Sequence, residues 1–429
     1  MALCPLNTTK YKIWPLNEIE EVTYIKISPC TSLVGLVFLD GKSLKILQID
    51  YSTLIYKEIL NYHSDFEIED LKWSPDCCAL LLVSLRDCHF TVVNCLNAEI
   101  IFRVQDPKIV NLASVCWVPD SKHIISISTF NIFTFAHSSQ DGRRIILPSI
   151  CCDDDYRPLI AFNHNGKYAA SVTLNSSDYY VNLLSTSSWN VLWNRKCGFR
   201  SVQGLEWSSN SLMLAIWNSY KKVSFLCFDG EHIKQLFYDN FRCSGFLLGI
   251  FSPNKDLFVA TCLQNETNLV LVYNLVTWQL CAVLNHGLEQ HSNPGRVHRP
   301  SRKVVSQLGF SHCGNLLASA LMDNHILIWD LRKGFELCKV LNTLSSFTGL
   351  QWHPKKTQIA ALTSNGTVLV WKYSKGGPVD RNDKLCSVDT NSTVAGTLIW
   401  SKSNLIISPF RGMQGALVLI RNKRFKKEK

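Results

Sequence analysis

The sequence is dominated by a repeat unit that recurs along almost its whole length. Two neighbouring copies, residues 306–334 and 348–376, align without a gap when one is shifted by 42 positions, which places Phe310 on Trp352. Each copy contains an aromatic residue, a short polar break, an apolar run rich in small residues, a turn, and a β-rich run that ends in Trp. The turn Asn365-Gly366 lies between two apolar runs and favours a β-hairpin, since Gly tolerates positive φ. Each copy is therefore predicted to supply at least three antiparallel strands.

The position of Phe310 and Trp352, here called the anchor, recurs in nine units. The anchors are Ile27, Trp73, Trp117, Phe162, Trp207, Phe251, Phe310, Trp352 and Trp400. Their spacings are 46, 44, 45, 45, 44, 59, 42 and 48 residues. Most anchors are followed by Ser-Pro-Asp, Asn-Gly or similar sequences, which are typical of turns because Pro presets φ and Asn or Gly accepts the left-handed conformation.

This period predicts an all-β fold, a WD-repeat β-propeller of about nine degenerate four-stranded units. A single unit cannot bury both faces of its sheet, so the units must pack side by side. Propellers typically have four to eight blades, and the prediction is therefore left at seven to nine blades. Trp329-Asp330 is the one complete Trp-Asp dipeptide at the end of a third strand, and no unit has a proper Gly-His.

The two ends of the repeat array are predicted to meet. Residues 10–16 precede the first unit and resemble one extra strand, whereas the last unit stops near Ile420 after its third strand. An N-terminal strand that completes the last blade would cover an exposed sheet edge and close the ring.

The predicted domain organisation is a propeller over residues 1–420 with a surface insert at 285–303, followed by a basic tail at 421–429. The insert lengthens one interval to 59 residues and is rich in Pro, Gly, Ser and Asn, as surface loops are. The tail has six basic residues against one acid, and the insert has a net charge of +3. Together they carry 5 + 3 = 8 of the formal net charge of +10, which leaves the propeller nearly neutral.

These two segments are candidate electrostatic docking sites for acidic surfaces such as tubulin, nucleic acid or an anionic membrane. The alternative is that they are solvated ends that only favour solubility. The candidate docking residues are Arg421, Lys423, Arg424, Lys426 and Lys427 in the tail, and Arg296, Arg299, Arg302 and Lys303 in the insert.

Composition indicates a chain that can bury a large core: 46% of its residues are hydrophobic and 18% are charged. No apolar run approaches the roughly 18 residues that a membrane span requires, and the first residues lack the form of a signal peptide. The 17 cysteines are scattered, with no Cys-X-X-Cys, so we expect reduced thiols that act mostly as small hydrophobic residues.

No motif predicts catalysis, a cofactor or a metal. Gly41-Lys42-Ser43 resembles the end of a phosphate-binding loop, but no helix follows it, and Asp40-Gly41 is better interpreted as a hairpin turn. His286, His291 and His298 in the insert lack partner cysteines and match no zinc spacing. We therefore expect no enzyme activity, no cofactor and no metal.

The repeated tryptophans have a structural explanation. Because they recur at equivalent positions of successive units, they are expected to pack between blades rather than to bind a ligand. These structural anchors are Trp73, Trp117, Trp207, Trp352 and Trp400 at the anchor position, and Trp329 and Trp371 at the ends of third strands.

Four segments resemble one WD-repeat family found at centrosomes and spindle poles, known as WD repeat-containing protein eight. They are Asp178-Tyr179-Tyr180-Val181, residues 205–218 (LEWSSNSLMLAIWN), residues 252–260 (SPNKDLFVA) and residues 274–287 (NLVTWQLCAVLNHG). The resemblance follows the unit order along nearly the whole chain, including the position of the insert. The chain departs from the family at Gly287, where the family has Pro, and its insert is shorter.

The resemblance implies a non-catalytic adaptor at the microtubule-organising centre, in the cytoplasm and cytoskeleton. It implies a coiled-coil microtubule-anchoring protein as partner and, in fungi, a minus-end-directed kinesin-14 motor. The implied role is anchoring microtubule minus ends and supporting spindle assembly, without a membrane partner. The alternative is a nuclear or ribonucleoprotein WD-repeat factor that uses the basic tail, although nucleic acid is not the partner we expect.

Overall fold

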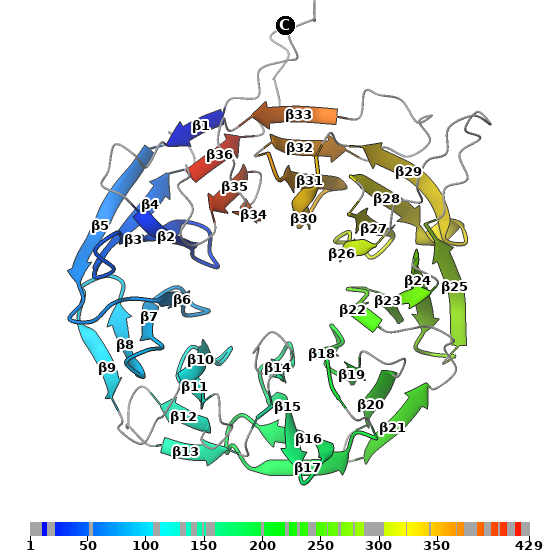
Figure 1. The fold of residues 1–429 in the computed structure, drawn as a ribbon, viewed down its shortest axis with the longest axis horizontal. Coiled ribbons are helices and arrows are strands. Elements are labelled where there is room, and N and C mark those ends of the chain that lie inside the picture. The colour runs from blue at the N-terminus through cyan, green and yellow to red at the C-terminus, as the bar shows by residue number, and fades with distance from the viewer. Residues whose placement is uncertain are drawn as a thin grey trace, which may run out of the picture.

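Each repeat unit folds into one antiparallel four-stranded sheet, and the sheets are arranged around a closed ring (Figure 1). This is seen in a computed structural model that describes residues 11–14, 22–50, 55–105, 112–128, 134–138, 144–147, 150–151, 159–198, 201–218, 223–229, 232–238, 246–254, 256–264, 267–277, 279–286, 304–322, 324–342, 345–365, 367–372, 384–389, 396–401, 404–409 and 417–421. These residues form nine sheets, which are numbered here as blades 1 to 9 in chain order. The all-β propeller is therefore confirmed, at the upper end of the predicted range of blades.

Within each of blades 1 to 8, four consecutive strands pair in chain order, from the ring axis outwards (Figure 1). Blade 1 consists of β2 (Val22–Ile27), β3 (Leu33–Phe38), β4 (Ser43–Asp50) and β5 (Ile55–His63). Blade 2 consists of β6 (Asp70–Trp73), β7 (Ala79–Ser84), β8 (His89–Asn94) and β9 (Ile100–Gln105). Blade 3 consists of β10 (Leu112–Trp117), β11 (His123–Ser128), β12 (Thr134–Ser138) and β13 (Arg144–Leu147).

Blades 4 to 6 follow the same order. Blade 4 consists of β14 (Ile160–Phe162), β15 (Tyr168–Asn175), β16 (Asp178–Ser185) and β17 (Val191–Lys196). Blade 5 consists of β18 (Gly204–Trp207), β19 (Met213–Trp217), β20 (Val223–Asp229) and β21 (His232–Tyr238). Blade 6 consists of β22 (Phe246–Phe251), β23 (Leu257–Gln264), β24 (Thr267–Asn274) and β25 (Gln279–Asn285).

Blades 7 and 8 correspond to the two copies that align without a gap. Blade 7 consists of β26 (Val305–Phe310), β27 (Leu316–Leu321), β28 (His325–Asp330) and β29 (Glu336–Asn342). Blade 8 consists of β30 (Phe347–Trp352), β31 (Gln358–Thr363), β32 (Thr367–Lys372) and β33 (Lys384–Asp389). A 3-10 helix, η2 (Leu331–Lys333), links β28 to β29. No helix in the described part of the chain is long and apolar enough to span a bilayer.

Blade 9 combines the first and the last described strands of the chain, as predicted. Its inner three strands are β34 (Gly396–Ser401), β35 (Asn404–Pro409) and β36 (Leu417–Arg421), and its outer strand is β1 (Tyr11–Trp14). β1 pairs antiparallel with β36, with Tyr11 opposite Ile420 and Trp14 opposite Leu417. The N-terminal strand thus closes the ring and pairs with a sheet edge that would otherwise be free.

The hydrophobic core is distributed between neighbouring blades. One cluster, for example, joins Leu44 and Ile46 of blade 1 to Leu71, Trp73 and Leu80 of blade 2, all of them buried. The apolar runs of the second strands, such as Ala79–Ser84 and Leu316–Leu321, are buried at every position because both sheet faces are covered by adjacent blades. This arrangement explains why these strands are continuously apolar instead of alternating.

In six blades the turn after the anchor contains one left-handed residue, four positions beyond the anchor. These residues are Thr31, Cys77, Ser121, Gly166, Ser211 and Gly314, with φ between 59° and 69°. Glycine therefore occupies two of these six positions. At the other four positions a small residue adopts this conformation. In blades 1, 2 and 5 the serine directly after the anchor also closes the turn with a side-chain hydrogen bond. Ser74 Oγ, for example, accepts from Ala79 N at 2.9 Å.

Candidate protein-interaction faces

Five anchor tryptophans join neighbouring blades by a hydrogen bond. In each case the indole Nε1–H donates to a backbone carbonyl of the preceding blade, at the residue just before that blade's own anchor. The N···O distances are 3.1 Å from Trp73 to Lys26, 3.1 Å from Trp117 to Lys72, 3.0 Å from Trp207 to Ala161, 3.0 Å from Trp352 to Gly309 and 3.2 Å from Trp400 to Gln351. These side chains hold blades together and are not available to a ligand.

Trp329 and Trp371 lie near the ends of β28 and β32, and both are buried. Trp329 Nε1 donates to Ser319 Oγ at 3.0 Å, and the same hydroxyl lies 2.9 Å from His286 Nε2. The imidazole ring packs against the Trp329 indole edge to face, with centroids 5.5 Å apart. His286 thus links the last strand of blade 6 to the interior of blade 7.

Strand β25 extends into the segment that was predicted as the insert, residues 285–303. Asn285 is the last residue of β25, and His286 is 1% exposed and belongs to the core of the ring. The sequence pattern missed this role because the partners of His286 are 33 and 43 positions further along the chain. Residues 287–303, which include Arg296, Arg299, Arg302, Lys303, His291 and His298, lie outside the described residues.

Polar side chains just before the anchors form a second set of links between blades. Lys72 Nζ donates to the Val115 carbonyl at 2.6 Å, and Gln351 Oε1 accepts from Trp400 N at 3.2 Å. Glu206 occupies the same position in blade 5; burial raises the pKa of its carboxyl group to about 7, although a hydrogen bond from the Phe251 backbone acts in the opposite direction. These contacts satisfy backbone groups on the inner strands and stiffen the ring.

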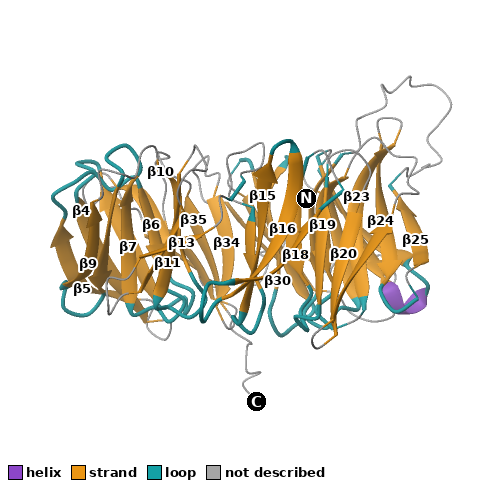
Figure 2. Ribbon diagram, turned by 90° about the horizontal axis from the view of Figure 1, so that it is seen from below, coloured by secondary structure: helices purple, strands orange, loops and turns teal. Residues whose placement is uncertain are grey.

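The ring has two faces that differ in which connections they carry. Since the strands of a blade are antiparallel, the first-to-second and third-to-fourth turns lie on one face, here called the lower face, which carries η2 in Figure 2. The second-to-third turns and the connections between blades lie on the other, upper face. β36 is a third strand and ends on the lower face, whereas β25 is a fourth strand and ends on the upper face. The basic tail and the basic insert are therefore attached to opposite faces of the ring.

The described part of the lower face carries exposed lysines in blades 7 and 8. Lys333 lies in η2, Lys355 and Lys356 in the turn after Trp352, and Lys372 at the end of β32. None of these four lysines takes part in the ion pairs of the described residues, and among those residues the exposed acid on the same face of these two blades is Glu336. Sequence reasoning missed this group because its members are spread over 40 positions and meet only through the fold.

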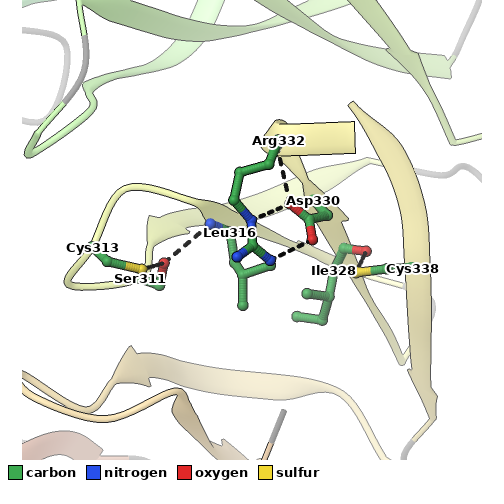
Figure 3. Close-up of polar contacts among 7 residues, drawn as sticks. All are labelled: Ser311, Cys313, Leu316, Ile328, Asp330, Arg332 and Cys338. Carbon is green, nitrogen blue, oxygen red and sulfur yellow. Dashed lines mark hydrogen bonds and ion pairs between the residues drawn. The ribbon is translucent and has the colours of Figure 1, made fainter. Parts of the chain in front are cut away.

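One basic side chain next to this group is neutralised. Arg332 binds Asp330 with Nε to Oδ1 at 2.9 Å and Nη2 to Oδ2 at 2.6 Å (Figure 3). The hydrogen bonds and charge of Arg332 lower the pKa of the Asp330 carboxyl group, which is fully buried. The Asp330 side chain also accepts from Arg332 N at 3.0 Å and caps η2. Asp330 therefore has a structural role.

Arg421 is the last residue of β36, so the tail joins the lower face in blade 9, beside blade 8. The remaining tail candidates, Lys423, Arg424, Lys426 and Lys427, lie outside the described residues. We use the name basic sector for Lys333, Lys355, Lys356, Lys372 and Arg421, which occupy the lower face of three consecutive blades.

The Gly41-Lys42-Ser43 segment is a hairpin turn between β3 and β4. Gly41 has φ of 67°, and Asp40 Oδ1 accepts from the backbone nitrogens of Lys42 and Ser43 at 3.0 and 2.9 Å. These amides are directed at a carboxylate of the same turn and do not form a cradle for a phosphate. Among the described residues, no group of three or more His, Cys, Asp or Glu side chains is arranged to hold a metal ion.

Comparison with known proteins supports the assignment of the repeats. The model of the WD domain, G-beta repeat, matches residues 293–330, which end with β28 in blade 7. The chain is a WD-repeat propeller. WD repeat-containing protein WRAP73 of Mus musculus is 23% identical over 397 residues, which cover 78% of this chain and 80% of that protein.

Two solved structures share this fold. The C-terminal WD40 domain of Sif2 aligns with a TM-score of 0.52 at 12% identity, covering 84% of this chain and 98% of that one. The computationally designed Ika8 protein aligns with a TM-score of 0.51 at 15% identity, covering 82% of this chain and 96% of that one. At this level of identity the similarity concerns the fold alone.

Proposed function

We propose that this propeller is a non-catalytic scaffold at the centrosome or spindle pole, where it helps to anchor microtubule minus ends and supports spindle assembly. Two observations support the location: the resemblance of four segments to the centrosomal WD-repeat family, and the similarity to WRAP73 over 78% of the chain. WD-repeat propellers act generally as platforms for protein partners.

The proposed partner is a coiled-coil microtubule-anchoring protein, with a kinesin-14 motor as a further member of the assembly. A rigid disc suits such a partner, because a preformed surface loses little conformational entropy when a helical segment docks on it. The links between inner strands, such as those of Trp352 and Lys72, provide this rigidity.

The observation that carries the docking proposal is the basic sector on the lower face. Four lysines with no ion-pair partner among the described residues, followed by the point where the basic tail begins, favour an acidic stretch of the partner. Charge complementarity would speed the encounter and fix the orientation, while apolar contacts would supply most of the affinity. The tail would contribute at longer range, through a field screened over about 8 Å at physiological salt.

Affinity purification with charge-reversed variants tests this proposal. Lys355→Glu combined with Lys356→Glu should reduce recovery of the coiled-coil partner at least tenfold, because both changes place acids where the partner's acids would lie. The matched control is Lys122→Glu combined with Lys167→Glu, since both of these lysines are also exposed in first-to-second turns of the lower face, in blades 3 and 4. Equal recovery with both double variants would contradict docking at the basic sector.

The second candidate function is a nuclear or ribonucleoprotein assembly factor. The same basic sector and tail favour it, because clustered lysines also bind phosphates. This function predicts binding to RNA that weakens steeply with salt, roughly in proportion to the number of phosphate contacts, and that is lost without residues 421–429. Purified protein that fails to bind RNA at 50 mM salt would exclude this alternative.

A further inference from the structure

Two cysteines of neighbouring blades meet on the lower face, in blades 1 and 2. Cys30 lies in the turn between β2 and β3, and Cys77 lies in the equivalent turn between β6 and β7. Cys77 occupies the left-handed position four residues after its anchor, with φ of 64°, which directs it towards the turn of blade 1. The backbone N of Cys30 donates to Cys77 Sγ at 3.2 Å. Equivalent contacts elsewhere in the ring are made by hydroxyls, for example from Asp76 N to Ser121 Oγ at 3.0 Å.

The thiol of Cys30 is surrounded by hydrogen-bonding groups. Its sulfur lies 3.2 Å from Ser28 Oγ and 3.0 Å from Ser32 Oγ. Cys30 is exposed to solvent and Cys77 is partly exposed. A small oxidant can therefore reach the first thiol, and the sulfur of the second residue lies 3.2 Å from the backbone nitrogen of the first.

The chemistry of the two thiols differs. Partial burial raises the pKa of Cys30, but the hydrogen bonds from Ser28, Ser32 and Cys77 outweigh burial and bring its pKa down to about 7. Burial and the neighbouring Cys30 raise the pKa of Cys77 to about 11. Because the thiolate is the nucleophile, Cys30 is the thiol that reacts first.

From this contact we infer that Cys30 and Cys77 form a peroxide-sensitive dithiol, in which Cys30 is the reacting and Cys77 the resolving residue. Oxidation joins the lower-face turns of blades 1 and 2 by a disulfide. The site is independent of the proposed scaffold function.

The reaction balances with one molecule of hydrogen peroxide. The Cys30 thiolate attacks one peroxide oxygen, the O–O bond breaks, hydroxide leaves, and Cys30 becomes a sulfenic acid. The Cys77 sulfur then attacks the Cys30 sulfur and the S–O bond breaks. The proton from Cys77 converts the leaving hydroxide to water. Two thiols are oxidised by two electrons, and the peroxide is reduced.

Peptide mapping without reductant tests the disulfide. After reduction and treatment of the full chain with hydrogen peroxide, tryptic digestion should yield peptide 27–42 linked to peptide 73–86. Because the second peptide also contains Cys78, the mapping is repeated with Cys78→Ser, which should leave the linked peptide unchanged. Cys30→Ser and Cys77→Ser should each abolish it.

The order of reaction is tested with dimedone, which captures sulfenic acids. Cys77→Ser should increase dimedone labelling of Cys30 at least fivefold, because the resolving thiol is gone while Ser can still accept from Cys30 N. Cys281 is the internal control, since it is exposed but burial raises the pKa of its thiol. The inference is overturned if the linked peptide is absent from Cys78→Ser, or if Cys30 in Cys77→Ser is labelled no faster than Cys281.

Discussion

Replacement of Trp352 by Phe isolates the contribution of one hydrogen bond between blades. Trp352 is 8% exposed and its Nε1 donates to the Gly309 carbonyl at 3.0 Å. Phe keeps an aromatic ring but removes this donor and leaves the Gly309 oxygen without it. Loss of the bond costs about 1 kcal/mol, and the missing indole volume costs roughly another 1 kcal/mol. We therefore expect the free energy of unfolding to fall by about 2 kcal/mol.

The matched control is Trp189→Phe. Trp189 is 4% exposed, and its Nε1 has no hydrogen-bond partner among the described residues. The same change there removes volume without removing a hydrogen bond, so the expected loss is about 1 kcal/mol or less.

Urea denaturation followed by tryptophan fluorescence and circular dichroism measures both variants against the parent protein. At the usual entropy of unfolding per residue, a loss of 2 kcal/mol corresponds to a fall in Tm of about 2 °C for a chain of this length. Equal losses for the two variants would refute the idea that the anchor indoles stabilise the ring through their hydrogen bonds.

Three further predictions concern closure, pH and the cap of η2. Deletion of residues 1–14 removes β1 and frees the edge of β36; static light scattering should show aggregation, and a monomer with unchanged Tm would contradict closure by β1. Glu206→Gln should stabilise the protein by roughly 1–3 kcal/mol at pH 8 but not at pH 4. The pKa of Glu206 is about 7 in the folded state, against an ordinary value of 4.5. The protonated carboxyl group therefore favours folding at low pH, and this contribution is lost as pH rises through 7. A pH-independent difference in urea midpoints would contradict this assignment. Asp330→Asn should lower the free energy of unfolding by about 1–2 kcal/mol at pH 7 and by less below pH 4. The reason is that the pair with Arg332, which lowers the pKa of Asp330, stabilises the fold only while the carboxylate is charged. An unchanged urea midpoint at pH 7 would show that this pair contributes nothing.

The period of the anchors was sufficient to predict the architecture. An anchor such as Trp73 ends the first strand of its blade, and the spacing to Trp117 equals one complete blade. The N-terminal strand was also predictable, because the last unit lacks a fourth strand and residues 10–16 have the required pattern. These features depend on local sequence and on the repeat length.

Contacts between blades could not be predicted in the same way. His286 was assigned to the insert because its role depends on Ser319 and Trp329 in the next blade. The contact between Cys30 and Cys77 depends on the left-handed conformation of Cys77, where the sequence pattern favoured Gly or Asn. The basic sector depends on which turns share a face, and this follows from strand direction in the closed ring.

We propose that a folded propeller face, rather than the basic tail alone, brings this chain to a spindle pole. The direct measurement is the fluorescence of the tagged chain at the pole, normalised to protein abundance, for three forms: the intact chain, the chain without residues 422–429, and the Lys355→Glu, Lys356→Glu variant. We predict a strong signal for the intact chain, a modest decrease without the tail, and loss of most of the signal in the double variant. A signal abolished by tail deletion alone, or absent from the pole even for the intact chain, would contradict the account.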